Sequence, residues 1–292
     1  MKRWWVFARE RFDPASHLIM IGLFVLAHLR VSGQALPAWQ VGLLSVGTLA
    51  FFFKLRLYDE LKDYELDCQI NPTRPLARGL LRKTEVRAGI LLCILLELGC
   101  FASAGWSSLT AISFAIGYSL LMYNEFFIRE RIRDLLTTYA VSHTVVCALL
   151  SGAVLCAATG ELPWELAPDL LRFSLSCWII FNVFEFGRKT FASSEERENV
   201  DSYSKVWGRA GAVLLLLAMV VAADYLLLSM ERLQGALLWG VQSAVSGLIA
   251  LVGGWYVLRD SALSARAYRG ASSVFIIITL VAVVGATFWP VA

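Results

Sequence analysis

Nine apolar runs, each about 17 to 23 residues long, recur along the chain and constrain its fold more than any other feature. About 20 helical residues cross a hydrocarbon core about 30 Å thick, so each run is long enough to span a bilayer. Inside lipid the backbone must satisfy its own hydrogen bonds, which favours helices for these runs. The predicted spans are 16–34, 38–58, 88–105, 107–128, 137–158, 169–191, 211–229, 235–257 and 271–290.

The composition agrees with this interpretation. Hydrophobic residues make up 58% of the sequence and charged residues only 17%, whereas about a quarter of a soluble domain is charged. We therefore predict an all-α, polytopic membrane protein with nine transmembrane helices, formed by a single domain over residues 1–292.

Lysine and arginine are concentrated on one side of the predicted topology. With nine spans, 23 of the 26 basic residues fall on the same side, and the other side holds only Arg30, Arg172 and Arg232. Basic residues accumulate on the cytoplasmic side of membrane proteins. The N-terminus and the two long polar connections, 59–87 and 186–210, are therefore expected in the cytoplasm, with the bacterial inner membrane as the expected location.

A ladder of carboxylates follows the second predicted span. On a helix, Asp59, Asp63 and Asp67 lie at i, i+4 and i+8, so their side chains stack on one face, next to Glu60. Hard oxygen ligands in a row suit Mg²⁺, which usually bridges carboxylates to the phosphates of a substrate. We interpret these four residues as metal ligands; the alternative is a solvated charged face.

A basic turn, Arg74-Pro75-Leu76-Ala77-Arg78-Gly79, begins seven residues after Asp67. Arg74 and Arg78 are candidate ligands for substrate phosphate because guanidinium groups bind phosphate oxygens through two parallel hydrogen bonds. Asp63, Asp67 and Arg74 are the candidate catalytic residues.

The carboxylate ladder and the basic turn together resemble the first motif of the UbiA superfamily of intramembrane prenyltransferases. That motif is N-D-x-x-D-x-x-x-D followed by R-P-x-x-x-G. Asp59 stands at its Asn position, Glu60 stands at its first Asp position, and the spacing to Arg74 is preserved. Two further fragments are similar to family elements: Arg9, Arg11 and Pro14 before the first span, and Tyr123, Arg129 and Arg131 after the fourth.

The resemblance implies nine transmembrane helices around a central cavity, with carboxylates of two cytoplasmic loops holding Mg²⁺. It implies transfer of a prenyl group from a prenyl diphosphate to an acceptor. The expected partners are an isoprenoid diphosphate or polyprenyl phosphate lipid, a small-molecule acceptor and membrane lipids, with no nucleic acid. Tyr123 and Asn124 are expected to line the substrate pocket, with an interfacial aromatic belt as the alternative.

The second motif departs from the family pattern. Ser202 stands at the Thr position of its tail, and counting back seven residues places Glu195 at the last aspartate. The two earlier aspartate positions fall on Arg188 and Phe191, although Glu185 would substitute if the helix register shifts. Glu185 and Glu195 are therefore candidate metal ligands. Arg188 and Lys189 are instead expected to bind phosphate.

Three other functions stay open at this stage. Gly187-Arg188-Lys189 resembles a branch of the superfamily that transfers a phosphoribosyl group from phosphoribosyl diphosphate to a polyprenyl phosphate. A terpene cyclase of the same fold is another possibility. A transporter without chemistry is the third, although charges clustered at one interface and continuous spans count against it.

Glu97, Asp224 and His143 lie inside predicted spans, where polar groups facing lipid are costly. We expect them to face the bundle interior. For Glu97 and Asp224, hydrogen bonds between helices are the preferred interpretation.

Overall fold

The computed structural model describes residues 2–198 and 200–288, which fold into helices joined by short connections. Nine of the described α-helices have 18 residues or more. They are α2 (Pro14–Ser32), α3 (Ala38–Lys62), α5 (Lys83–Ala102), α6 (Trp106–Tyr123), α8 (Leu136–Thr159), α9 (Pro168–Arg188), α10 (Tyr203–Leu228), α11 (Ala236–Leu258) and α12 (Ala262–Ala286). The shorter helices are α1 (Lys2–Arg11), α4 (Tyr64–Ile70), α7 (Arg129–Ile132) and the 3₁₀ turns η1 (Glu125–Phe127), η2 (Ser193–Glu195) and η3 (Glu231–Leu233).

Each of the nine predicted runs coincides with one long helix, so the all-helical membrane fold is confirmed. Residues 289 and 290 of the last predicted span lie outside the described residues. Seven of the long helices are apolar and long enough to cross a membrane. Helices α5 and α6 are not among these seven, since α5 carries four charged residues and α6 is rich in Ser and Tyr. Nine crossings and a cytoplasmic N-terminus therefore stay predictions.

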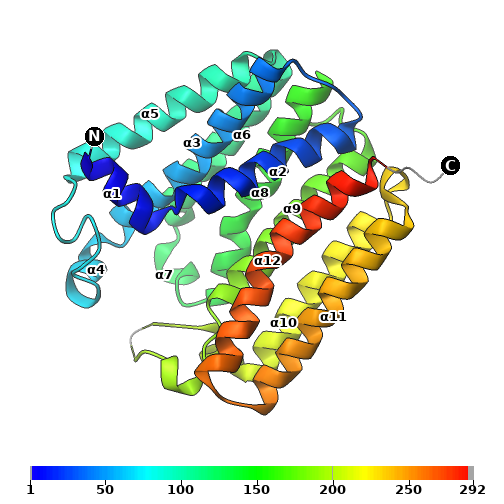
Figure 1. Cartoon of the computed structure of the whole chain (residues 1–292). Coiled ribbons are helices and arrows are strands. Elements are labelled where there is room, and N and C mark those ends of the chain that lie inside the picture. Colours follow the sequence, from blue (N-terminus) through cyan, green and yellow to red (C-terminus); the bar gives the residue numbers. More distant parts are fainter. Residues whose placement is uncertain (1, 199, 289–292) are drawn as a thin grey trace.

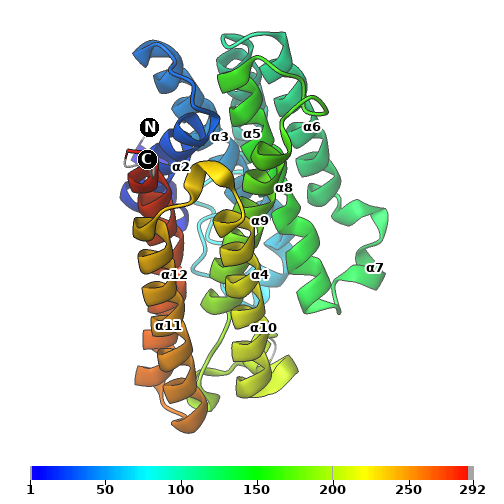
Figure 2. The same ribbon diagram turned by 90° about the vertical axis from the view of Figure 1, so that its right-hand side faces the viewer.

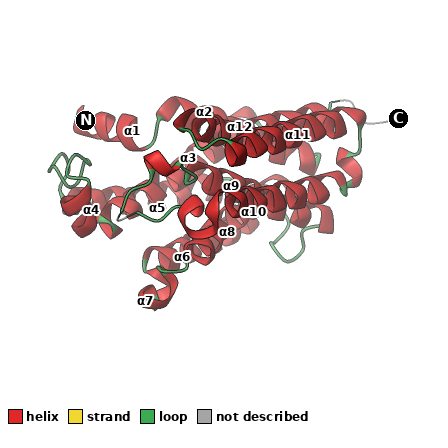
Figure 3. Cartoon of the chain, turned by 90° about the horizontal axis from the view of Figure 1, so that it is seen from below, coloured by secondary structure: helices red, strands yellow, loops and turns green. Residues whose placement is uncertain are grey.

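The long helices run side by side, and the two termini lie at opposite ends of the bundle (Figure 1). Helix α9 packs against α8, α10 and α12, while α2 packs against α3, α8 and α12. Turned by 90°, the bundle has α11 and α12 on one side and α5 and α6 on the other (Figure 2). Viewed from below, the described chain consists of helices and loops (Figure 3).

Loops 63–82, 124–135 and 189–202 lie at one end of the bundle, called the loop end below. This end receives the last turns of α3, α6 and α9, and the chain enters α5, α8 and α10 from it. The two motif connections predicted from the sequence therefore lie at the same end of the bundle.

Exposed tryptophans mark both ends of the long helices. Among the residues that the structure describes, the opposite end carries four of them: Trp39, Trp106, Trp164 and Trp239. The loop end carries three: Trp5, Trp207 and Trp255. Tryptophan gathers at both membrane–water interfaces because its ring is amphipathic. These two belts agree with a multi-pass membrane protein whose helix ends lie at the interfaces.

Polar groups inside the bundle pair with one another. Asp224 on α10 accepts hydrogen bonds from Gln242 (2.8 Å) and Ser246 (2.7 Å) on α11, and Lys54 on α3 donates to Glu97 on α5 at 2.5 Å. The expected interhelical role of Asp224 and Glu97 is thus confirmed. Lys54 corrects a detail of the sequence interpretation, because it is one of the 23 basic residues counted on the cytoplasmic side, whereas it is buried within α3.

Candidate functional site

The carboxylate ladder spans the junction of two helices. Helix α3 continues past the predicted end at residue 58 to Lys62, and α4 begins at Tyr64. Asp63 lies between them with φ −95° and ψ 4°. The Asp63 amide still donates to the Asp59 carbonyl at 3.0 Å, and the Asp67 amide donates to the Asp63 carbonyl at 2.7 Å. The i to i+4 backbone hydrogen bonds therefore connect all three aspartates, although the predicted continuous helix is broken at Asp63.

Each aspartate of the ladder is balanced by an arginine. The shortest distances are 3.2 Å for Asp59–Arg56, 3.6 Å for Asp63–Arg133 and 2.8 Å for Asp67–Arg74. Asp67 also accepts a hydrogen bond from Asn71 at 3.1 Å and is buried. The side chains of Asp59 and Asp63 are 43% and 38% exposed, so a ligand can reach them.

The three carboxylates influence one another electrostatically. Burial raises the pKa of Asp63 above its ordinary value of 3.8, and the negative charges of Asp59 and Asp67 raise it further. A raised pKa here means that the site disfavours a third negative charge. A cation bound among these oxygens would relieve that repulsion.

The donor chemistry of the ladder fits a hard divalent cation, because Asp59, Asp63 and Asp67 offer oxygen ligands only. Over residues 2–198 and 200–288, however, no group of three or more His, Cys, Asp or Glu side chains is gathered closely enough to enclose a metal. Any metal held here would therefore take part of its ligand set from water and from the substrate phosphates, as Mg²⁺ commonly does.

Glu60 faces away from the ladder. Its side chain is only 1% exposed. One carboxylate oxygen accepts a hydrogen bond from Arg11, and the other accepts from the Leu76 amide at 3.2 Å. Both oxygens are thus used to fix the basic turn against the end of α3. We leave Glu60 out of the proposed metal ligands, since its predicted metal role would require breaking both contacts.

The basic turn is held in place by neighbouring acids. Arg74 contacts Asp67, and Arg78 donates to Glu10 on α1 (2.8 Å) and to the Thr73 carbonyl (2.7 Å). The hydrogen bond from Arg78 lowers the pKa of the Glu10 carboxyl below its ordinary value. Arg74 thus lies beside the ladder, whereas Arg78 is held against α1, and each must exchange an acidic partner in order to bind phosphate.

Two cations lie where α9 passes into the second loop. One carboxylate oxygen of Glu185 on α9 forms an ion pair with Arg188 (2.5 Å), and the other forms one with Lys189 (3.0 Å). The negative charge of Asp59 also favours the charged guanidinium of Arg188. Because both Glu185 oxygens are occupied by cations, this carboxylate orients Arg188 and Lys189 and is a poor metal ligand.

Gly187 explains how α9 delivers these cations. A Cβ atom at Gly187 would lie 2.2 Å from the Cβ atom of Ser272 on α12, so a larger residue would push the two helices apart. The close approach fixes the last turn of α9 against α12. The Gly-Arg-Lys sequence is therefore required by packing at its first position.

Glu195 anchors the second loop to α12. Its two oxygens accept hydrogen bonds from Arg269 at 2.9 and 2.8 Å, and the Ala192 amide donates to it at 3.2 Å. The hydrogen bonds from Arg269 lower the pKa of Glu195 below its ordinary value of 4.5. Glu195 is therefore fully engaged, and the structure does not bring it to the ladder as the motif count predicted.

Sequence reasoning missed a polar cluster on the other side of the ladder. Lys62, on α3, donates to the Tyr139 hydroxyl at 2.7 Å and lies 3.4 Å from Nε2 of His143 and 3.8 Å from Glu125. The sequence held a signal for this cluster, because Lys62 lies three residues after Asp59 and i+3 neighbours share a helix face.

Glu125 gathers the basic residues of loop 124–135. It is buried and binds Arg133 (2.9 Å) and Arg129 (3.0 Å), and Arg133 in turn reaches Asp63.

Glu125 lies next to the predicted pocket residues. Tyr123 stacks against Tyr58 with ring centroids 4.7 Å apart, whereas Asn124 is exposed and caps α6. Of the two, only Tyr123 packs into the bundle.

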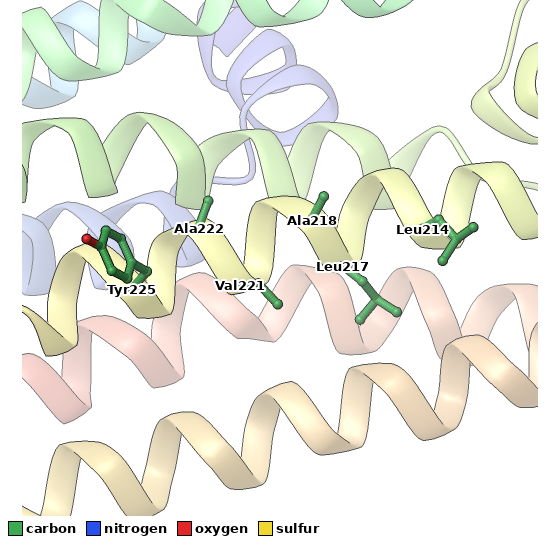
Figure 4. Close-up of a pocket in the computed structure, with 6 residues that line it drawn as sticks. All are labelled: Leu214, Leu217, Ala218, Val221, Ala222 and Tyr225. Carbon is green, nitrogen blue, oxygen red and sulfur yellow. The ribbon is translucent and has the colours of Figure 1, made fainter.

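The two predicted motif loops meet. A cavity of about 150 Å³ is lined by Ile70 and Asn71 from the first loop and by Arg197, Glu198 and Val200 from the second. A larger, mainly apolar groove of about 610 Å³ lies along one face of α10, from Leu214 to Tyr225 (Figure 4), and none of the ladder carboxylates lines it. The first cavity supports a shared site built from both loops.

Comparison with known proteins identifies the family and supports the fold. The UbiA prenyltransferase family matches residues 18–279. A digeranylgeranylglyceryl phosphate synthase superposes with a TM-score of 0.64 at 15% identity, covering 98% of this chain and 99% of that one. The apo structure of a UbiA homologue from Aeropyrum pernix K1 gives 0.61 at 18% identity, covering 94% and 97%. Among curated proteins, none matches the chain in sequence. From the family match and the shared fold, the chain belongs to the UbiA prenyltransferase family.

Proposed function

We propose that the chain is an Mg²⁺-dependent prenyltransferase that ionises a prenyl diphosphate and transfers the prenyl group to a small-molecule acceptor. The observation that carries the proposal is that the two loops line one cavity at the loop end, with the Asp59–Asp67 ladder at the start of the first loop and Arg188 and Lys189 at the start of the second. Carboxylates for a metal and cations for phosphate are what a diphosphate substrate requires.

Asp59, Asp63 and Asp67 are the residues that would hold Mg²⁺. When bound, the metal neutralises charge on the diphosphate and so makes it a better leaving group. Glu60, Glu185 and Glu195 serve instead to hold the loops and the cations in position, since their oxygens are already engaged.

Arg74, Arg78, Arg188 and Lys189 would bind the phosphate oxygens. Each now contacts a carboxylate, at distances between 2.5 and 3.0 Å. Substrate phosphate would replace the three acids that hold these four cations, since Glu185 holds both Arg188 and Lys189, and the cations return to the acids when the product leaves. The exchange favours phosphate because a diphosphate offers several oxygens to one guanidinium fork.

The reaction breaks the C–O bond between the allylic carbon and the diphosphate, and the electron pair leaves with the diphosphate. The acceptor then donates an electron pair to that carbon and loses a proton. The paired rings of Tyr58 and Tyr123 are suited to stabilise positive charge through their π faces. The apolar helices around them exclude water, which would otherwise capture the cation.

The test is Mg²⁺-dependent release of pyrophosphate by the purified protein in nanodiscs, with a panel of prenyl diphosphates of different length. Asp63→Asn and Asp67→Asn should each lower the rate on the order of 100-fold or more, the loss seen when one electrostatic partner of a transition state is removed. Glu65→Gln is the matched control, because Glu65 is an exposed acid on the same short helix. Normal rates in both ladder variants would refute the metal assignment.

A second candidate function is transfer of a phosphoribosyl group to a polyprenyl phosphate. It is favoured by Arg188, which stands at an aspartate position of the family pattern, and by the adjacent Lys189, since both cations would suit the phosphate of a lipid. The same assay with phosphoribosyl diphosphate separates the two candidates. Release of pyrophosphate from this donor alone would replace the prenyl transfer proposal. We further propose that the site opens to the cytoplasm, as the skew in basic residues predicts.

A further inference from the structure

We propose that α1 is an interfacial helix that binds anionic lipid headgroups and thereby braces the first motif loop. The inference goes beyond prenyl transfer, since lipid binding by α1 does not depend on which reaction the chain performs. It rests on three features of α1: a buried aromatic face, a set of ion pairs to the motif loop, and an exposed basic face.

One face of α1 is packed against the bundle. Phe7 is fully buried and lies edge-on to Phe53 of α3, with ring centroids 5.7 Å apart, while Trp4 lies 6.4 Å from the same ring. A Cβ atom at Gly89 of α5 would lie 2.8 Å from the Trp4 ring, so the glycine makes room for this tryptophan. Helix α1 is thus firmly seated on α3 and α5.

The same packing includes the motif loop. Phe7 shares a small hydrophobic core with Leu76 and Leu81, which flank the second half of the basic turn. The turn that carries Arg74 and Arg78 therefore rests partly on α1. A shift of α1 would disturb the turn through this shared core.

Three ion pairs join α1 to the segment around the motif. Arg11 binds Glu60 at the end of α3. Glu10 binds Arg78 at 2.8 Å, and Arg3 binds Glu85 at the start of α5, also at 2.8 Å. These pairs attach one end of α1 to the motif loop and the end of α3, and the other end to the start of α5, and they are the physical link between the helix and the candidate site.

The remaining face of α1 has no protein covering it. Lys2, Trp5 and Arg9 lie at i, i+3 and i+7, which places them on one side of the helix, and all three are exposed. Trp5 is 58% exposed. Two cations flanking a tryptophan form a typical surface for the headgroup region of a membrane.

The position of α1 identifies the partner as lipid. Only Phe12 and Asp13 separate it from α2, which is long and apolar enough to cross a membrane. The exposed face therefore lies at the level where a span leaves the bilayer. Anionic headgroups complement its charge, and a basic residue near such a surface gains favourable attraction to it.

The binding test uses full-length protein in a neutral detergent, titrated with short-chain phosphatidylglycerol. The apparent dissociation constant is taken from the rise in the unfolding midpoint, since a ligand that binds the folded state stabilises it. Lys2→Gln/Arg9→Gln should weaken this binding by about 25-fold, or about fivefold for each basic residue. Arg131→Gln/Arg259→Gln is the control, because it removes the same charge from two exposed residues elsewhere at the loop end.

Unchanged affinity in Lys2→Gln/Arg9→Gln overturns the proposal, and so does an equal loss in the control. A wild-type chain that phosphatidylglycerol does not stabilise, or that inorganic phosphate stabilises equally, overturns it as well. None of these measurements needs a prenyl donor. The lipid proposal can therefore fail while the transferase proposal stands, and the reverse.

The coupling to the motif has its own readout at Cys68, an exposed thiol on α4. If α1 braces the loop, phosphatidylglycerol should slow the reaction of Cys68 with a maleimide severalfold in the wild-type chain. Glu10→Gln, which breaks the link to Arg78, should remove this effect while keeping lipid affinity. Equal slowing in Glu10→Gln would show that lipid acts on the loop by another route.

Discussion

Lys54 of α3 and Glu97 of α5 form an ion pair that is fully buried between the two helices. The Nζ and Oε2 atoms are 2.5 Å apart, and neither side chain is exposed. The ammonium group also lies 4.3 Å from the centre of the Phe51 ring. The second oxygen of Glu97 has no hydrogen-bond partner among the described residues. The pair is therefore sensitive to any change on either side.

Removal of one member of this pair should destabilise the protein strongly. Lys54→Met leaves the Glu97 charge buried without a partner, which typically costs about 3–5 kcal/mol. The paired variant Lys54→Met/Glu97→Met should recover most of that loss, because two apolar groups of similar volume need no partner. Reversible unfolding in mixed micelles measures all three free energies. A paired variant as unstable as Lys54→Met would contradict this explanation.

The same pair shows where the sequence was informative and where it was not. Hydropathy is a local property, so all nine long helices could be predicted. The partner of a buried lysine depends on the tertiary structure. Lys54 and Glu97 are 43 positions apart, and local hydropathy does not link them. For the same reason the end of α3 was placed too early, since Lys62 is stabilised by Glu125 of η1 and Tyr139 of α8, which are distant in sequence.

Arg188 should govern the binding of the phosphorylated substrate. Arg188→Gln removes a charge-assisted hydrogen bond worth about 1.5–3 kcal/mol, which corresponds to a loss of about 10-fold to 150-fold in kcat/KM. Arg188→Lys should recover only part of this loss, because an ammonium group lacks the planar fork of guanidinium. Initial rates of pyrophosphate release measure both variants. Arg259→Gln is the control, an exposed arginine at the same end of the bundle.

The second loop illustrates why a motif count can mislead. Counting back from Ser202 placed Glu195 among the metal ligands, but spacing alone does not show what faces a side chain. Arg269, 74 positions later, donates hydrogen bonds to both carboxylate oxygens of Glu195. The Arg188-Lys189 pair was read correctly as a departure from the acidic pattern because residue type alone decides it. Their phosphate-binding role stays a prediction.

The Glu195–Arg269 contact should make the loop dependent on pH. The folded-state pKa of Glu195 lies below its ordinary value of 4.5, mainly because Arg269 donates hydrogen bonds to it. The contact therefore contributes fully above pH 4.5 and is lost as the pH falls through the lowered value. Hydrogen exchange of the backbone at 189–198, corrected for its intrinsic pH dependence, should show protection falling over that range.

Glu195→Gln should reduce this protection at neutral pH and flatten its pH dependence. Arg269→Gln should do the same, and the double variant should add little, since both remove one contact. Additive losses in the double variant would mean that Glu195 acts through a different partner.

The turn that carries Glu125 is strained, and the strain should be measurable. Glu125, Phe126 and Phe127 have φ values of 50°, 54° and 58°, a left-handed conformation that L side chains rarely adopt. Phe127 is 78% exposed, so its ring contributes little packing. Phe127→Gly should therefore stabilise the protein by up to about 1 kcal/mol.

Phe126 shares the backbone strain, but its ring packs edge-on to His143 and Tyr118. Phe126→Gly should destabilise instead, because the lost packing exceeds the relieved strain. Unfolding midpoints of the two variants decide the point, and a loss of stability in both would show that the left-handed turn is not under strain.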